Sequence, residues 1–519
     1  MKSSFSRREF LRTATYGSAG LVLGSRLAAQ PAKLPGKPNL IVFLPDQLRA
    51  DAIVGTNASN VHAPNLHKLA SESVIFERTY VTHPICAPSR SSLLSGTWPH
   101  QNGCTNNTLA LSRKFRCLPE MVADSDYRTG YFGKWHLGDE FSAQRGFQEW
   151  ASIEDEYLKS ADGDRKIEGV SDYTKFLVSE GYKPDRDNKY FSYEFVCKLP
   201  LELRKPKFLA TKACQFLENH RNAPFILFVA FFEPHPPYCG PLSTEHSPDA
   251  ISLDVTAENT FGDDIPLRYR LLQEFYRKLL GTTEAYRETK QRYFGLINEI
   301  DRSIGMILAK LDDLGLTDRT ITVLTSDHGD MMSAHSLLGK IVMFDNSARV
   351  PYLIRMPGQQ RTLNCPNPIS HIDFAPTMLD LLGKQPDSQC VGQTRAGLVR
   401  GELPSPGPVF MEWAPGNQIV YKHKLFRTRE VIKFVYKNTK LGTKEDIKRC
   451  INESTRAVVS PEGWKLCLRD KDKNELYNLR DDPDERTNLY YKNVRPEIMS
   501  RLTGEINKWQ ESVGDSLKV

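Results

Sequence analysis

The stretch CAPSRSSLLSG, which spans Cys86–Gly96, is the most informative part of the chain and places a candidate site. Pro88 suits the first turn of a helix, because the N–H that proline lacks has no helical partner there. Cys86 then lies just before the helix N-terminus, where free N–H groups and the helix dipole attract anions. Arg90, about one turn further on, can direct its forked donors to the same place. The stretch predicts a helix that presents a cysteine and an arginine to an anion.

Three short apolar runs have the composition of buried parallel strands. They span residues 39–44, 225–232 and 320–325. Polar side chains follow the end of each run, namely Asp46 and Gln47, His235, and Asp327 and His328. Ligands of open α/β sheets bind beyond the carboxyl ends of the strands. We therefore expect these side chains to converge on one site.

An apolar stripe at helical spacing runs from Tyr293 to Leu311, directly before the third apolar run. Gly315 fits the end of that helix. A helix that leads into a buried strand favours an alternating chain. We predict an α/β fold with a large, mixed, mostly parallel sheet flanked by helices. Beyond a linker rich in Gly and Pro at residues 401–408, short alternating segments and a final helix predict a smaller α+β subdomain.

The Cys86–Gly96 stretch resembles the signature of the type I sulfatases, in which Cys-x-Pro-x-Arg precedes a small, apolar helix and a glycine. Residues 475–489 resemble the C-terminal signature of that family, for which we expect a structural docking role. The resemblance implies an alkaline-phosphatase-like fold. It also implies that Cys86 is converted to formylglycine, whose aldehyde hydrate is the nucleophile that cleaves sulfate esters.

The resemblance further implies a divalent cation held by residues that follow two of the strands. Asp46 stands at the first position of the family's Asp-Asp pair, and Gln47 stands at the second. Glutamine still offers an oxygen ligand, with one negative charge fewer. Asp327 and His328 match the second metal segment, and Cys86, as formylglycine, completes the ligands. Oxygen-rich sites suit Ca²⁺ or Mg²⁺ and an imidazole admits Mn²⁺, and the resemblance favours Ca²⁺.

The block GKWHLG at residues 133–138 resembles another part of the family pattern. It implies that Lys134 and His136 flank the formylglycine hydrate. A lysine can hold an anion electrostatically, and a histidine with a pKa near neutrality can move protons. We expect Lys134 to stabilise the sulfuryl group and His136 to act as the base that regenerates the aldehyde.

His235 and Lys340 lie in two further segments that match the family pattern. His235 lies in a proline-rich loop and is the candidate acid that protonates the leaving oxygen. Lys340 is expected to bind sulfate oxygens and support the leaving group, and Arg90 adds to the stabilisation of charge. Four other polar residues near these segments are expected to serve the fold: Asp330, His335, His371 and Asp373.

The N-terminal sequence resembles a bacterial twin-arginine export signal, with Arg7 and Arg8 ahead of a weakly apolar stretch at Thr13–Gly24. That stretch is too short to span a bilayer, and we expect cleavage near Ala28 and Ala29. The resemblance implies the Tat export machinery as a partner and a periplasmic or extracellular location, without a stable membrane anchor. Because this pathway moves folded proteins, we expect most of the ten cysteines to stay free thiols, with one or two late disulfides.

The formal charge of +6 comes mostly from the first 30 residues, which contribute +4. The remaining chain is close to neutral, at about +2, and gives no basis for nucleic-acid binding. The predicted organisation is a signal peptide at residues 1–30, a catalytic domain at 36–400 and a C-terminal subdomain at 401–519.

We expect an exported enzyme that hydrolyses sulfate monoesters, with carbohydrates as the substrate class. Residues 140–220 and 236–285 carry no family pattern and are expected to shape the pocket. A formylglycine-generating enzyme or an anaerobic sulfatase-maturating enzyme is the expected partner that modifies Cys86. Two alternatives stay open. One is a phosphonate or phosphodiester hydrolase on the same fold, favoured by Asp46-Gln47, and the other is a non-catalytic sulfoglycan-binding protein.

Overall fold

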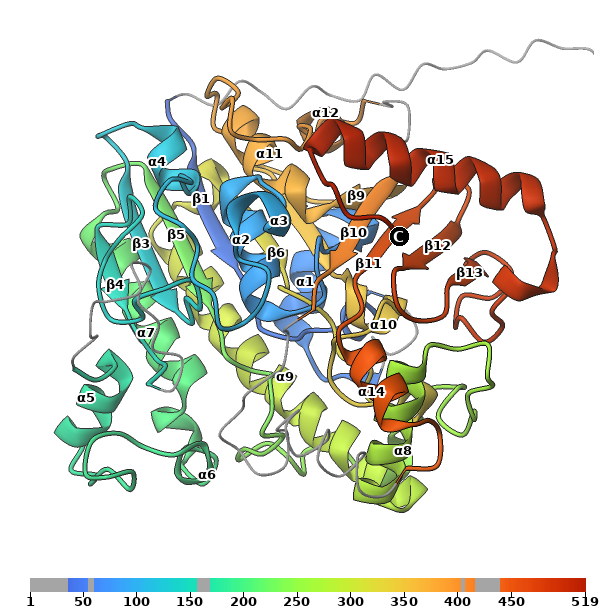
Figure 1. Cartoon of the computed structure of the whole chain (residues 1–519). Coiled ribbons are helices and arrows are strands. Elements are labelled where there is room, and N and C mark those ends of the chain that lie inside the picture. The colour runs from blue at the N-terminus through green and yellow to red at the C-terminus, as the bar shows by residue number, and fades with distance from the viewer. Residues whose placement is uncertain (1–35, 55–59, 156–168, 403–406, 416–438) are drawn as a thin grey trace, which may run out of the picture. The chain divides into compact units, whose positions relative to one another are not determined.

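A central sheet covered by helices makes up the larger part of the fold (Figure 1). The structure is a computed structural model that describes residues 36–54, 60–155, 169–402, 407–415 and 439–519. The predicted signal peptide at residues 1–30 and part of the predicted linker, residues 403–406, lie outside the described residues.

Nine of the described strands form one sheet with the order β4-β3-β5-β1-β6-β8-β2-β7, and β9 pairs with β2. The strands are β1 (Asn39–Phe43), β2 (Val74–Tyr80), β3 (Arg128–Gly133), β4 (Glu149–Ala151), β5 (Phe225–Ala230), β6 (Thr320–Thr325), β7 (Arg349–Val350), β8 (Tyr352–Arg355) and β9 (Leu363–Ser370).

The three predicted strands are β1, β5 and β6, and they lie side by side in the sheet. β1 pairs in parallel with β5 and with β6, so that Leu40 lies opposite Ile226 on one side and Ile321 on the other. β8 is antiparallel to both β6 and β2, which makes the sheet mixed. The prediction of a mixed, mostly parallel sheet is confirmed, and the carboxyl ends of three central strands share one edge.

Helices cover both faces of this sheet. The described α-helices are α1 (Pro64–Ser71), α2 (Cys86–Ser95), α3 (Pro99–Asn102), α4 (Leu118–Val122), α5 (Asp172–Ser179), α6 (Tyr193–Val196), α7 (Lys205–Asn219), α8 (Leu267–Leu280), α9 (Thr283–Asp313), α10 (Asp345–Ala348), α11 (Phe374–Leu381), α12 (Ala396–Val399), α14 (Lys444–Ile451) and α15 (Pro496–Val513). The predicted stripe is the buried face of α9, which ends just before Gly315.

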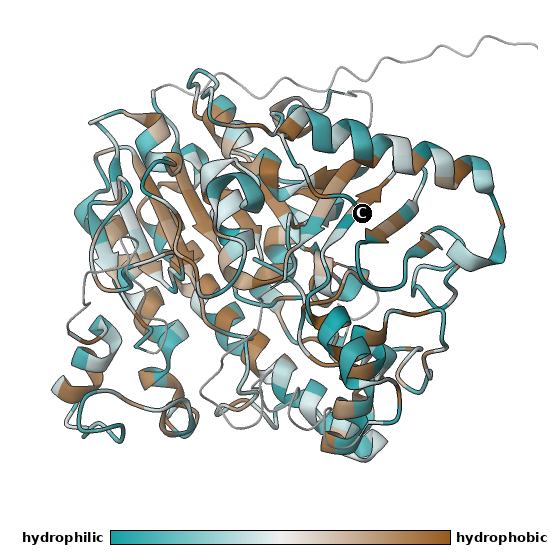
Figure 2. Ribbon diagram, viewed as in Figure 1, coloured by the Kyte–Doolittle hydropathy of each residue, from teal (hydrophilic) through white to brown (hydrophobic). Residues whose placement is uncertain are grey.

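Successive side chains of a strand point to opposite faces of the sheet, which explains the two layers of helices. Ile41 and Phe43 of β1 pack in one apolar cluster with residues of α1, α7 and α9, whereas Leu40 and Val42 pack in another with residues of α2, α4 and α11. The central strands β1 and β5 are accordingly apolar along nearly their whole length, while the outer helices are two-sided (Figure 2). Among the described residues, no helix is both long enough and apolar enough to cross a membrane.

A second, antiparallel sheet lies in the C-terminal part, with the order β10-β11-β12-β13. Its strands are β10 (Val409–Trp413), β11 (Thr455–Val459), β12 (Trp464–Arg469) and β13 (Glu475–Asn478). One face packs against α15 through Leu502 and Ile506, and the other shares an apolar cluster with residues of α8 and the 331–348 segment. The smaller α+β part is therefore present as predicted.

Candidate active site

The loops that follow four adjacent strands, together with the start of α2, build the site. Asp46 and Gln47 follow β1, Asp327 and His328 follow β6, His235 follows β5, and Lys134 and His136 follow β3. Because these strands are neighbours in the order β3-β5-β1-β6, their carboxyl ends meet at one edge. The structure thus brings Asp46, Asp327, His328 and Lys134 into contact with one another and with Cys86.

Helix α2 begins at Cys86 itself, one position earlier than expected, after Ile85 in extended backbone. Ile85, the residue before the helix, makes no side-chain hydrogen bond that caps it. The side-chain oxygen of Asn107 accepts from the Ala87 N–H at 2.9 Å. The helix ends at Ser95 and is followed by Gly96, whose φ of 66° is the left-handed conformation that glycine adopts without strain. Every residue of α2 is buried, so Cys86 is held in a fixed place at the N-terminal end.

Four residues present metal-ligand atoms that all lie within 4.8 Å of one another: Asp46, Cys86, Asp327 and His328. We call these four residues the ligand cluster. The Cys86 Sγ lies 3.2 Å from the His328 Nε2, and that nitrogen lies 3.6 Å from a carboxylate oxygen of Asp46 and of Asp327. The His328 Nδ1 contacts the Gly329 carbonyl at 3.0 Å, which favours Nε2 as the ligand atom. Two carboxylates and an imidazole fit a divalent cation.

Gln47 lies beside the ligand cluster in an unusual backbone conformation, with φ at 73°. Its N–H donates to Asp327 Oδ1 at 3.1 Å. Its side-chain oxygen accepts from the Lys340 ammonium, and its side-chain nitrogen donates to Asp330 and, at 3.2 Å, to the Tyr238 hydroxyl. Gln47 therefore links Lys340 to the cluster, and its role as a metal ligand stays a prediction.

Arg90 and Lys134 neutralise the two carboxylates of the ligand cluster. Arg90 donates to Asp327 Oδ2 at 2.7 Å and to Asp46 Oδ2 at 3.3 Å, and its third donor reaches the Lys134 carbonyl at 2.6 Å. The Lys134 ammonium lies 2.6 Å from Asp46 Oδ2 and 3.9 Å from the Cys86 Sγ. Burial disfavours a charged Asp46, but Lys134 and the other cations outweigh it and hold the pKa of Asp46 well below its usual value.

The Cys86 thiol lies where these positive charges meet. Burial and the Asp46 carboxylate both oppose ionisation, but Lys134, Lys340 and His328 outweigh them and lower the pKa of Cys86 below its usual value. A position where a buried thiol favours the anion also favours an anionic oxygen on the same carbon. The electrostatics of residue 86 thus suit a nucleophile.

The loop of Lys134 and His136 is held by Glu140, a residue that the sequence motifs did not single out. Glu140 is fully buried and accepts from the backbone N–H of Trp135 at 3.1 Å and of His136 at 2.6 Å. These bonds hold His136 at a φ of 63°. Burial raises the pKa of Glu140 to about 7. The acidic side chain four positions after His136 was visible in the sequence but belongs to no motif.

His235 is buried in the loop after β5, with its ring packed at 4.7 Å from that of Phe232. Its Nδ1 donates to the Pro236 carbonyl at 2.7 Å, which makes Nε2 the reactive nitrogen. Burial, Lys340 and Lys134 together outweigh Asp46 and hold the pKa of His235 well below its usual value. A bound anion would raise that pKa again, because it favours the charged imidazolium.

The four residues expected to serve the fold lie outside the ligand cluster. His335 stacks on Phe344 with ring centroids 4.4 Å apart, and burial lowers its pKa to about 4. His371 and Asp373 lie in the turn before α11. Asp330 accepts from backbone N–H groups of its own loop, as expected, but it also accepts from Gln47, a contact that the sequence did not reveal.

One disulfide joins Cys197 to Cys239, with an S–S distance of 2.02 Å. The other eight cysteines are free thiols in the structure: Cys86, Cys104, Cys117, Cys214, Cys365, Cys390, Cys450 and Cys467. This agrees with the expectation of mostly free thiols and few disulfides.

Comparison with known proteins agrees with this geometry. A profile described as Sulfatase matches residues 38–384, and one described as N-sulphoglucosamine sulphohydrolase, C-terminal, matches residues 333–448. An ulvan-active sulfatase of Formosa agariphila is 29% identical over 386 residues, which cover 71% of this chain and 66% of that protein. An N-acetylglucosamine-6-O-sulfatase of Bacteroides thetaiotaomicron is 23% identical over 564 residues, covering 96% of this chain and 91% of that protein.

The fold is also that of a solved enzyme. The phosphonate monoester hydrolase SpPMH of Silicibacter pomeroyi superposes with a TM-score of 0.73 at 20% identity, covering 92% of this chain and 96% of the other. At this identity the likeness concerns the fold alone. The sulfatase profile, in contrast, covers well over half of the chain, from β1 to beyond α11. The chain therefore belongs to the sulfatase family of sulfuric ester hydrolases.

Proposed function

We propose that this sulfatase hydrolyses sulfate monoesters of carbohydrates by means of a formylglycine formed from Cys86. The observation that carries the proposal is the ligand cluster, whose four ligand atoms lie within 4.8 Å of one another. Cations line the same place, since Lys134 lies 2.6 Å from Asp46 and Arg90 lies 2.7 Å from Asp327. Buried charges of both signs can hold a divalent cation and an anionic ester together.

Lys134 and Lys340 would bind the sulfuryl oxygens. Lys134 lies 3.9 Å from the Cys86 Sγ, and Lys340 reaches the site through Gln47. Arg90 donates to both carboxylates of the cluster, so we assign it the task of holding them in place while its charge stabilises the bound ester.

His235 and His136 would move the protons. A bound sulfate ester raises the pKa of His235, which then protonates the leaving oxygen through Nε2. His136 is the candidate base that would remove the proton from the second hydroxyl of residue 86 once the alcohol has left, so that sulfate leaves and the aldehyde forms again. A His136→Ala variant is expected to release the alcohol once and then stall, whereas full turnover by that variant would contradict the assignment.

Asp46, Asp327 and His328 would hold the cation together with residue 86, with Gln47 beside them. The formylglycine hydrate would supply the nucleophile, and the cation would offset negative charge on the sulfuryl oxygens. The donor set suits Ca²⁺ first, with Mg²⁺ and Mn²⁺ as alternatives to be distinguished by reconstitution.

The substrate class is supported by the relatives, which include an ulvan-active sulfatase and an N-acetylglucosamine-6-O-sulfatase. The test compares kcat/KM for glucosamine 6-O-sulfate and 4-nitrophenyl sulfate with that for a 4-nitrophenyl phosphonate monoester. The protein is made together with a maturation enzyme. We expect the sulfates to be preferred by about 10²-fold or more. A preference for the phosphonate would favour the alternative supported by Asp46-Gln47 and the SpPMH fold.

Export and domain organisation complete the proposal. The pair Arg7-Arg8 supports a twin-arginine signal at residues 1–30, export to the periplasm or beyond, and the Tat machinery as a partner. The catalytic domain would then span residues 36–400 and the C-terminal subdomain 401–519. Replacing both arginines by lysine should leave the protein in the cytoplasm, and export of that variant would contradict this part.

A further inference from the structure

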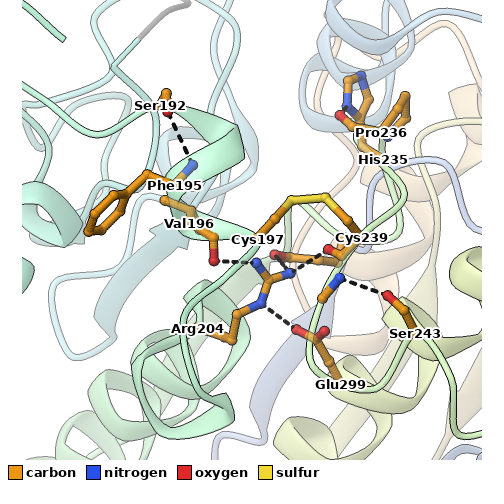
Figure 3. Close-up of a disulfide and its surroundings, with 12 residues drawn as sticks. Ser192, Phe195, Val196, Cys197, Arg204, His235, Pro236, Cys239, Ser243 and Glu299 are labelled. Atoms are coloured by element: carbon orange, nitrogen blue, oxygen red, sulfur yellow. Dashed lines mark hydrogen bonds and ion pairs between the residues drawn. A yellow bond between two sulfur atoms is a disulfide. The ribbon is translucent and has the colours of Figure 1, made fainter. Parts of the chain in front are cut away.

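A buried arginine outside the active site contacts the loop of His235 at two points, one before His235 in the sequence and one after it (Figure 3). Arg204 directly precedes α7 and is 3% exposed. Its Nη2 lies 3.5 Å from the Glu233 Oε1, two residues before His235, and 3.3 Å from the Cys239 carbonyl oxygen, four residues after it. One guanidinium group therefore spans the loop that carries the candidate acid.

The same guanidinium connects this loop to two helices. Its Nε donates to Glu299 of α9 at 2.8 Å, and its Nη1 donates to the carbonyl of Val196, the last residue of α6, at 2.8 Å. We call Arg204, Glu233 and Glu299 the Arg204 cluster. Because α9 is a long helix packed in the main apolar cluster, these contacts fix the loop against a rigid element.

The disulfide adds a covalent link between the same two segments. Cys197 directly follows α6, and Cys239 is the residue whose carbonyl accepts from Arg204. Figure 3 shows the disulfide beside the guanidinium group, with His235 and Pro236 earlier in the loop that leads to Cys239. The loop is thus attached to α6 twice, once through sulfur and once through Arg204.

The packing around Arg204 leaves no space for a side chain at residue 240. A Cβ on Gly240 would lie 2.1 Å from the Glu299 Oε1 and 3.1 Å from the Arg204 Nη2. A side chain at residue 240 would therefore displace the Glu299 carboxylate from its place beside Arg204.

We propose that Arg204 is a positioning residue for His235, with the Cys197–Cys239 disulfide as a second tether on the same loop. The inference rests on the proposed role of His235 as the acid. Arg204 acts on the reaction through the loop, so its loss should lower the rate of the step that needs the acid. A displacement of about 1 Å in such a group can cost about 10²-fold in rate.

The test uses leaving groups of different basicity, because only a basic leaving group needs a proton from the enzyme. Lysine at position 204 keeps the charge but cannot span Glu233, Cys239 and Val196 at once. For Arg204→Lys we expect kcat to fall about 30-fold on glucosamine 6-O-sulfate but less than about 3-fold on 4-nitrophenyl sulfate. The KM and the cation content should stay unchanged. Arg501→Lys, at an exposed arginine of α15, is the matched control and should leave both rates unchanged.

His235→Ala separates a failure of this inference from a failure of the proposed function. If His235→Ala shows the dependence on the leaving group and Arg204→Lys does not, Arg204 does not position His235. If His235→Ala itself shows no such dependence, the assignment of the acid is wrong, and the inference is overturned with it. If both show it and the double variant is no worse than His235→Ala, the inference is supported.

A second variant keeps the inference testable if Arg204→Lys does not fold. The double substitution Cys197→Ser, Cys239→Ser removes the covalent tether and leaves no buried charge without its partner. We expect a loss of about 3-fold on glucosamine 6-O-sulfate and none on 4-nitrophenyl sulfate. An equal loss on both substrates, or no loss, would overturn the role of the disulfide as a tether.

Discussion

The ligand cluster and the Arg204 cluster are both groups of buried charges, but they are built differently. In the ligand cluster, four metal-ligand atoms converge within 4.8 Å, and the cations stand around them. In the Arg204 cluster, one guanidinium donates outward to two carboxylates and two backbone carbonyls on different elements. The first arrangement concentrates ligand atoms at a point, and the second distributes bonds among elements.

The ligand cluster is built to bind a cation and take part in the reaction, whereas the Arg204 cluster is built to hold other residues in position. Converging anionic ligands repel one another and so attract a cation, with pKa values displaced by their neighbours. A guanidinium whose donors reach separate elements holds those elements at fixed distances. Substitutions in and around the two clusters are therefore expected to have different effects on activity, metal content and stability.

Cys86→Ala should abolish activity, because it removes the residue that becomes the nucleophile. We expect a loss of at least about 10³-fold in kcat/KM on 4-nitrophenyl sulfate. Cys104→Ala, at another fully buried cysteine that forms no disulfide, is the control and should retain the activity. Thermal unfolding of both variants shows whether the fold survives. Comparable activity in the two variants would show that the reaction does not need Cys86 of the ligand cluster.

Asp327→Asn should deplete the cation, whereas Glu299→Gln in the Arg204 cluster should not. Both carboxylates are buried and both contact an arginine, at 2.7 Å for Asp327 and 2.8 Å for Glu299. We expect Asp327→Asn to lose most of the bound metal and about 10²-fold or more in rate. Metal content by mass spectrometry after dialysis is the measurement. If both variants lose the metal equally, the distinction between the clusters fails.

Glu140→Gln should change how stability depends on pH. Burial raises the pKa of Glu140 from 4.5 to about 7, so the folded protein takes up a proton that the unfolded chain releases in this interval. The contribution of Glu140 to the free energy of unfolding is fully present below pH 4.5 and is lost as the pH rises through about 7. Since glutamine stays neutral, the stability of the variant relative to the natural protein should rise by up to about 3 kcal/mol between pH 5 and 8. Urea unfolding at several pH values measures it, and a constant difference would contradict it.

Gly240→Ala should destabilise the protein, and Gly504→Ala should not. The new methyl group at residue 240 would collide with Glu299, and the cost is expected to be about 1–3 kcal/mol. Gly504 lies in α15 with no heavy atom within 4 Å of an added Cβ, so alanine there should stabilise by up to about 1 kcal/mol. Equal effects at the two positions would show that the Arg204 cluster tolerates displacement.

The convergence of the ligand cluster could be predicted from the sequence because its members adjoin the ends of recognisable elements, and the resemblance to the sulfatases supplied their predicted role as metal ligands. Asp46 and Asp327 follow apolar runs that are strands β1 and β6, and Cys86 begins a helix marked by Pro88. The pairing of parallel strands then dictates that their ends meet. The apolar stripe of α9 was equally plain, since its period is that of a helix.

The Arg204 cluster could not be predicted in this way. Its members come from three segments that meet only in the folded chain. Arg204 and Glu299 lie in no motif, and Glu233 lies beside His235 without a role of its own in that motif. The disulfide could not be predicted either, because Cys197 and Cys239 lie 42 positions apart and ten cysteines allow many pairings. Glu140 holds the backbone of His136, a contact that depends on the path of the loop rather than on residue type. Residues that position others were therefore the part that the sequence did not reveal.

Mass spectrometry of the tryptic peptide Thr79–Arg90, in which Cys86 is the sole cysteine, measures directly whether residue 86 is converted to formylglycine. The protein is made together with a maturation enzyme, and a sulfatase known to be matured serves as the control. We expect an aldehyde in place of the thiol of Cys86, and a modified fraction that tracks activity on sulfate esters. An unmodified thiol in fully active protein, or under conditions that mature the control, would show that formylglycine is not the nucleophile.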